Sequence, residues 1–190
     1  WRVESADGHP VHGAFTFQVG DVATGDSDAL ARRLLAADGG DEGVGVVFAV
    51  VRFAVFAALV LLVGAAAFCL SGWPEGLRLA PVRRLLWWVW GVASVATLVS
   101  IGAQGAYVGA LPLTDLVDVD VIGSVLDTRY GRVALARLAL LVAAGVLLLV
   151  TARHRSVEDP PVATPVGVPA RVGLAALGLA LLATLGLSGH

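Results

Sequence analysis

Four long apolar runs constrain this chain more than any other feature. They cover about residues 44–70, 85–111, 132–151 and 170–188. At about 1.5 Å per residue, a helix over each run is long enough to cross a hydrocarbon core of roughly 30 Å. Composition agrees, because 57% of the 190 residues are hydrophobic and only 15% are charged. The sequence therefore predicts an all-α membrane protein with four transmembrane helices, and an ordinary soluble enzyme does not fit.

The charges narrow the possible functions further. The formal net charge is −2, and the 13 basic residues are all arginines scattered along the chain. A binder of nucleic acid is expected to concentrate positive charge on one surface, so we expect no nucleic-acid partner. The chain also has no Gly-rich phosphate loop and no nucleophile motif, so we expect no enzymatic activity.

Arginines in the short loops predict the orientation of the helices. Loop 71–84 carries three arginines and loop 152–169 carries two, with Arg171 just beyond. The loop between the second and third helices is acidic instead. Because cytoplasmic loops are enriched in Lys and Arg, the two arginine loops are expected inside the cell. The acidic loop and the N-terminal segment are then extracytoplasmic, and membrane lipid surrounds the helices.

The first 43 residues differ from the rest of the chain. Residues 1–20 alternate as strands do, and Asp-Gly-His-Pro at residues 7–10 is a turn signal, so we expect a β-hairpin. An isolated hairpin is marginally stable in water, which makes this one the expected end of a β domain that continues upstream. Residues 21–43 are predicted to be an acidic linker. The chain contains no Met and begins within a strand pattern, so we expect it to be a fragment.

Asp7 and His9 are the first candidate metal ligands. They are two positions apart, so on an extended segment both side chains project to the same side. A carboxylate with an imidazole suits Cu(II) or Zn(II) better than Cu(I). Two ligands do not complete a site, and the alternative is an ordinary turn in which His9 is solvated.

These N-terminal residues resemble a known copper-binding domain. The sequence Trp-Arg-Val-Glu-Ser-Ala-Asp-Gly-His-Pro-Val at residues 1–11, followed by residues 13–17, is similar to the C-terminal end of a CopC domain. CopC is a small periplasmic β-sandwich. The resemblance implies that Asp7 and His9 bind Cu(II) together with an N-terminal histidine of the upstream domain.

The apolar part resembles CopD, a copper-resistance membrane protein often fused behind CopC. The resemblance rests on three elements: Thr-Arg-Tyr-Gly-Arg-Val-Ala-Leu-Ala-Arg-Leu at residues 128–138, Arg52-Phe53 ahead of Gly64, and Ser188-Gly189-His190. It implies that residues 44–190 are the first helices of a larger bundle in the bacterial inner membrane. It also makes His190 a candidate copper ligand, the alternative being an interfacial histidine.

Together the two resemblances predict a CopC and CopD fusion that handles copper. Residues 1–20 would be the hairpin remnant of the β-sandwich, residues 21–43 the linker, and residues 44–190 the membrane domain. The implied role is copper import or resistance, with Cu(II) bound outside the membrane and extracytoplasmic copper carriers as possible partners. Two alternatives remain open, namely a haem-binding electron-transfer membrane protein and a copper sensor or assembly factor that does not transport.

Polar residues inside the apolar runs need partners or water. Arg52 and Arg137 are expected to reach the outer interface or to pair with the acidic loop. A second set lies on one helical stripe: Thr97, Ser100, Gln104 and Tyr107. The stripe is expected to face protein or water, either lining a polar path or hydrogen-bonding packed helices.

Two further local patterns concern the membrane interfaces. Trp87, Trp88 and Trp90 follow Arg83 and Arg84, which predicts an aromatic belt at the cytoplasmic side. Apolar residues with helical spacing at 121–126 predict a short interfacial helix in the acidic loop.

Overall fold

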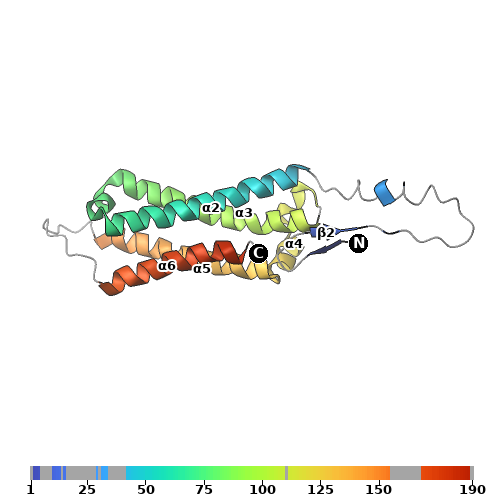
Figure 1. Cartoon of the computed structure of the whole chain (residues 1–190). Coiled ribbons are helices and arrows are strands. Elements are labelled where there is room, and N and C mark those ends of the chain that lie inside the picture. The colour runs from blue at the N-terminus through green and yellow to red at the C-terminus, as the bar shows by residue number, and fades with distance from the viewer. Residues whose placement is uncertain are drawn as a thin grey trace, which may run out of the picture.

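The computed structural model describes residues 2–4, 10–13, 15, 29, 31–33, 42–109, 111–154 and 168–188. Four long helices lie side by side and alternate in direction (Figure 1). They are α2 (Glu42–Ser71), α3 (Ala80–Gly109), α5 (Arg129–His154) and α6 (Val168–Leu187). Helix α3 contacts α2 and α5, and α6 contacts α5 and α2, so the four helices form a closed bundle.

Three of these helices are long and apolar enough to cross a membrane. The stretches are Gly43–Ser71, Ala80–Gly109 and Arg129–Val150, which confirms the predicted class of multi-pass helical protein. The described apolar stretch of α6, Arg171–Leu187, is shorter than the roughly 20 residues that a span requires. A fourth span therefore stays a prediction.

Short helices connect the long ones. The 3₁₀-helix η1 (Pro74–Arg78) joins α2 to α3, while η2 (Leu113–Val117) and α4 (Val119–Leu126) join α3 to α5. Helix α4 confirms the predicted short helix in the acidic loop. It begins after Asp118, whose carboxylate accepts hydrogen bonds from the backbone N–H of Asp120 at 2.8 Å and of Val121 at 3.4 Å.

Replacing Asp118 by alanine is expected to destabilise α4. The substitution removes the acceptor at the N-cap, and loss of such a cap costs about 1 kcal/mol. The measurement is the thermal unfolding midpoint of the purified full-length protein in detergent. Ser124→Ala is the control, since the exposed Ser124 hydroxyl donates only to the Val121 carbonyl within the same helix. An equal loss of stability in both variants would contradict the role of Asp118 as the N-cap residue of α4.

Glycines let the connection between α3 and α5 lie directly on the bundle. A Cβ atom at Gly102 of α3 would overlap the carbonyl oxygen of Leu116. A Cβ atom at Gly131 of α5 would overlap the carbonyl oxygen of Val125. The segment Leu113–Leu126, which we call the cap, therefore lies against α3 and α5 near one end of the bundle at backbone-to-backbone distance.

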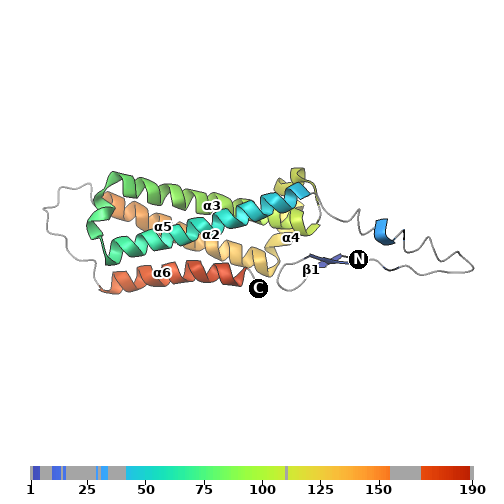
Figure 2. The same ribbon diagram turned by 45° about the horizontal axis from the view of Figure 1, so that its top comes forward.

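Two short strands lie at the same end of the bundle as α4 (Figures 1 and 2). Strand β1 (Arg2–Glu4) pairs antiparallel with β2 (Pro10–His12), with Val3 opposite Val11. The residues between the strands lie outside the described part of the chain. The origin of the pair in a β-sandwich domain is therefore still a prediction.

The interior of the bundle divides along its length. A large apolar cluster contains Leu59, Leu86 and Leu141 with their neighbours, and a small one beside the cap contains Ile101, Val125 and Ala134. The buried polar side chains lie nearer the cap: Thr97, Ser100, Gln104, Arg137 and Thr184. The cap-side half of the bundle thus holds the polar groups that can carry chemistry.

One of the three tryptophans does not fit the expected aromatic belt. Trp88 is 75% exposed, but Trp90 is half-buried and its Nε1–H donates to the carbonyl oxygen of Leu141 on α5 at 2.7 Å. Gly145 makes room for this contact, because a Cβ atom there would lie 2.8 Å from the Trp90 ring. The belt prediction is wrong for Trp90, which joins two helices instead.

Candidate functional site

The centre of the polar half is the buried guanidinium of Arg137. Arg137 is only 2% exposed and lies in the first third of α5. Its Nε–H donates to the hydroxyl of Thr184 at 2.8 Å, and Nη2 donates to the carbonyl oxygen of Thr184 at 2.8 Å. Nη2 also donates to the hydroxyl of Ser188 at 3.0 Å. Neutral oxygens near the end of α6 therefore accept the hydrogen bonds of the charged guanidinium.

The hydroxyls that accept from Arg137 are themselves oriented by α6. Thr184 donates its own hydroxyl proton to the carbonyl oxygen of Leu181 at 2.6 Å, and Ser188 donates to that of Leu185 at 3.1 Å. Each hydroxyl oxygen thus has its proton directed to the helix backbone and its lone pairs available for the guanidinium. This arrangement joins α5 to α6 within the cap-side half.

The charge of Arg137 has no opposite charge beside it among the described residues. Its hydrogen-bond partners there are uncharged oxygens of Thr184 and Ser188. Arg52 is half-buried on α2 and its guanidinium carbon lies 5.9 Å from the centre of the Phe56 ring, a distance typical of a cation–π contact. Among the described residues, Arg137 therefore does not pair with the acidic loop as expected, because its hydrogen bonds go to oxygens of α6, while its expected reach to the outer interface stays a prediction.

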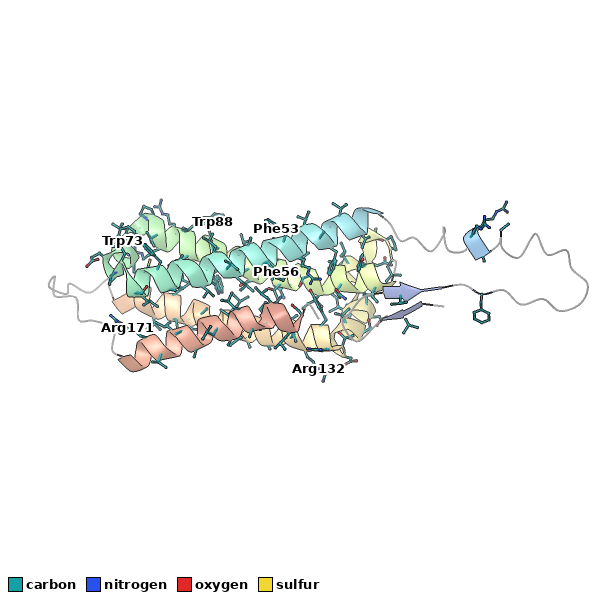
Figure 3. The ribbon with its side chains drawn as sticks, in the orientation of Figure 1. Phe53, Phe56, Trp73, Trp88, Arg132 and Arg171 are labelled. Atoms are coloured by element: carbon teal, nitrogen blue, oxygen red, sulfur yellow. The ribbon has the colours of Figure 1, made fainter. Side chains whose placement is uncertain are left out.

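A second arginine on the same helix, Arg132, differs from Arg137 in its burial. Arg132 is exposed and points away from the bundle near the cap, whereas Arg171 lies at the opposite end (Figure 3). Among the described residues, the Arg132 side chain bonds within its own helix turn, where its Nε–H donates to the carbonyl oxygen of Thr128 at 3.4 Å. Burial therefore distinguishes Arg137 from Arg132 although only five positions separate them.

The predicted polar stripe on α3 does face protein. Thr97 is 0% exposed, Ser100 2% and Gln104 5%. Thr97 donates its hydroxyl to the carbonyl oxygen of Ala93, and Ser100 donates to that of Thr97, both at 2.7 Å. Tyr107 stacks on Phe48 with ring centres 4.9 Å apart. Internal contacts therefore account for Thr97, Ser100 and Tyr107.

Tyr130 connects the stripe on α3 with α5. Its hydroxyl lies 3.5 Å from the carbonyl oxygen of Ser100, at the long limit for a hydrogen bond. Tyr130 thus joins α5, the helix that carries Arg137, to the stripe on α3.

The predicted metal ligands are not placed by the structure. Asp7, His9 and His190 lie outside the described residues. Within the described ranges, no group of three or more His, Cys, Asp or Glu side chains could hold a metal ion. Cys69 is buried on α2 at the end of the bundle away from the cap. The copper site of the N-terminal segment therefore remains a prediction.

The sequence did not indicate the partners of Arg137. Thr184 and Ser188 form a row of small residues with Ala176 and Ala180, a pattern typical of a close-packing helix face. The sequence does contain a signal for this pairing, because Arg137 lies near the start of one helix and Thr184 near the end of the next. Antiparallel neighbours bring such positions to the same depth, where a buried cation requires oxygen acceptors.

Comparison with known proteins identifies the family of the bundle. The family model of the copper resistance protein D-like N-terminal domain matches residues 36–190, which include all four long helices and the Arg137 region. No curated protein and no solved structure matches the chain. The resemblance to CopD is thus confirmed, while the resemblance of residues 1–17 to CopC lies outside the matched range. By the extent of this match, the chain belongs to the copper resistance protein D-like family through its N-terminal domain.

Proposed function

We propose that this chain belongs to a copper-handling protein of the bacterial inner membrane that binds Cu(II) on the outer side and takes part in copper import or resistance. The observation that carries the proposal is the family match over residues 36–190. Three apolar helices long enough to span a membrane agree with it. The protein is a binding and transport protein in this proposal and not an enzyme.

The orientation follows from the distribution of arginines and acids. Asp115, Asp118 and Asp120 belong to the connection between α3 and α5, whereas the arginines near the starts of α3 and α6 lie at the other end of the bundle (Figure 1). The positive-inside rule assigns the cap end to the extracytoplasmic side. The location of β1 and β2 at the cap end supports this assignment, because the N-terminal segment is expected on the same side (Figure 2).

Copper is the cargo in the proposed mechanism. The carboxylate of Asp7 and the imidazole of His9 bind Cu(II), with at least one further ligand from sequence upstream of this chain. The ion then passes to the outer end of the bundle, where His190 follows two residues after Ser188, a partner of Arg137. Extracytoplasmic copper carriers would deliver the ion to the first site.

The double substitution Asp7→Asn with His9→Asn tests the capture step. It removes the carboxylate charge and the imidazole nitrogens, so the affinity of the full-length protein for Cu(II) is expected to fall at least tenfold, or about 1.4 kcal/mol. The measurement is a competition titration with a chelator of known affinity. His12→Asn is the matched control, because His12 lies in β2 beyond the predicted turn.

Copper uptake into sealed vesicles then distinguishes a transporter from a protein that binds copper without transporting it. A transporter accumulates copper inside the vesicles, and the double variant slows this accumulation. Binding without accumulation would favour the copper sensor or assembly factor, and a Soret absorption band would favour the haem protein. Equal Cu(II) affinity in the double variant and in His12→Asn would contradict the proposed ligands.

A further inference from the structure

The three tryptophans near the start of α3 have different surroundings. Trp87 and Trp90 are half-buried, and their rings meet edge to face with centres 5.3 Å apart. Trp88 is 75% exposed and lies on the outer side of the bundle, in the half away from the cap (Figure 3). Contacts within the protein therefore account for Trp87 and Trp90, whereas Trp88 faces what surrounds the protein.

Trp88 belongs to a continuous exposed face of α3. Arg84 is exposed one turn before it, and the exposed side chains that follow on the same face are Val92, Val95 and Val99. Spacings of three and four residues keep these side chains on one side of the helix. The face therefore has a cation at one end, an indole beside it and aliphatic side chains beyond.

The order of these groups follows that of a phospholipid in a bilayer. At 1.5 Å per residue, Arg84 lies about 6 Å from Trp88 along the helix axis, and Val99 lies about 16.5 Å from it in the other direction. Tryptophan is enriched at the level of the headgroups, and a long arginine near a helix end extends toward them. Because α3 is a candidate membrane span, the valines below Trp88 are at the depth of the acyl chains.

The charge at this end of α3 favours an anionic headgroup. The connection from α2 into α3 carries Arg78, Arg83 and Arg84 against one acidic residue, Glu75. The first turn of α3 has no acidic residue, and the N-terminus of a helix dipole is positive. Arginine also binds phosphate oxygens with two parallel hydrogen bonds. A headgroup with a net negative charge is therefore expected to bind here more tightly than a zwitterionic one.

We propose that the exposed side of α3 formed by Arg84, Trp88, Val92, Val95 and Val99, which we call the lipid face, binds an anionic phospholipid of the phosphatidylglycerol class. The Arg84 guanidinium binds the headgroup phosphate, the Trp88 indole lies at the level of the glycerol esters, and the three valines contact an acyl chain. This binding involves no copper ligand, so its test is separate from that of the proposed function.

The test compares phosphatidylglycerol with phosphatidylcholine of the same acyl chains, each titrated into the full-length protein in detergent. Native mass spectrometry counts the bound lipids, and a saturable rise of the unfolding midpoint reports a ligand of the folded state. The wild type should bind phosphatidylglycerol more tightly. Arg84→Gln should lower that affinity about fivefold, as expected for one basic residue near a membrane surface, and leave the affinity for phosphatidylcholine nearly unchanged.

Arg83→Gln is the matched control for the headgroup contact. Arg83 is also exposed, but it lies about 100° around the helix from Arg84 and so outside the lipid face. Its replacement should leave most of the preference for phosphatidylglycerol. An equal loss in the two variants would overturn the proposal, because it would show attraction to the whole positive end of α3. Equal affinities of the wild type for the two lipids would overturn it as well.

Two further measurements test the rest of the lipid face. Trp88→Leu keeps an apolar side chain but removes the indole, so it should weaken the binding of both lipids while the preference for phosphatidylglycerol remains. Inorganic phosphate at constant ionic strength should not displace the lipid, because it has no acyl chain to contact the valines. Displacement by phosphate, or unchanged affinities in Trp88→Leu, would contradict binding of a whole phospholipid along this face.

Discussion

Replacing Gly102 by alanine is expected to displace the cap from α3 and to destabilise the folded protein by about 3 kcal/mol. The added Cβ atom would overlap the carbonyl oxygen of Leu116, which is a backbone atom and cannot move away by changing a rotamer. The substitution therefore forces a backbone shift, and overpacking of this kind costs about 1–3 kcal/mol or more. The measurement is the free energy or midpoint of unfolding of the full-length protein in detergent.

Gly91→Ala is the matched control for this prediction. Gly91 lies on the same helix, and a Cβ atom there would have no atom within 4 Å. Because alanine favours helices over glycine by up to about 1 kcal/mol, Gly91→Ala should be neutral or stabilising. If the two alanine variants lose the same stability, the close approach of the cap to α3 is not what makes Gly102 necessary.

Thr184→Val is the second substitution with a large expected effect. Valine nearly preserves the shape of threonine, but it removes the hydroxyl that accepts the Nε–H of Arg137. A hydrogen bond to a charged group contributes about 1.5–3 kcal/mol, so stability should fall by about this amount. The loss leaves a donor of a buried cation unsatisfied, since Thr184 is 5% exposed and Arg137 2%.

Thr184→Ser separates the hydrogen bond from packing. Serine keeps the hydroxyl and loses one methyl group, so its unfolding midpoint should lie much closer to the wild type than that of Thr184→Val. The opposite order of the two midpoints would show that the methyl group matters more than the bond to Arg137.

Much of the local structure was predictable from the sequence. The four apolar runs predicted the four long helices, and the helices extend a few residues beyond several of the expected limits. Helix α3 begins at Ala80, ahead of Arg83 and Arg84, because backbone hydrogen bonds continue outside the hydrocarbon region. The spacing of apolar residues predicted the short helix α4. Asp118 is its N-cap residue, and Asp is one of the residues preferred at that position.

The contacts between helices were not predictable in the same way. Trp90 looked like an interfacial residue by its neighbours, but it donates to Leu141 at a sequence separation of 51 positions. Arg137 looked like a residue in need of a carboxylate, but its acceptors on α6 are neutral oxygens up to 51 positions away. Both outcomes depend on the rotation of each helix about its axis, and helices that are apolar all round encode that rotation only weakly.

The sequence by itself determined that this chain forms long apolar helices, because hydrophobicity and backbone hydrogen bonding are satisfied within each segment in lipid. The tertiary structure alone decided that α6 supplies the partners of Arg137 and that the cap lies against Gly102. Such pairings depend on which faces and depths of separate helices meet, and that is settled by packing of the whole bundle rather than by any one segment.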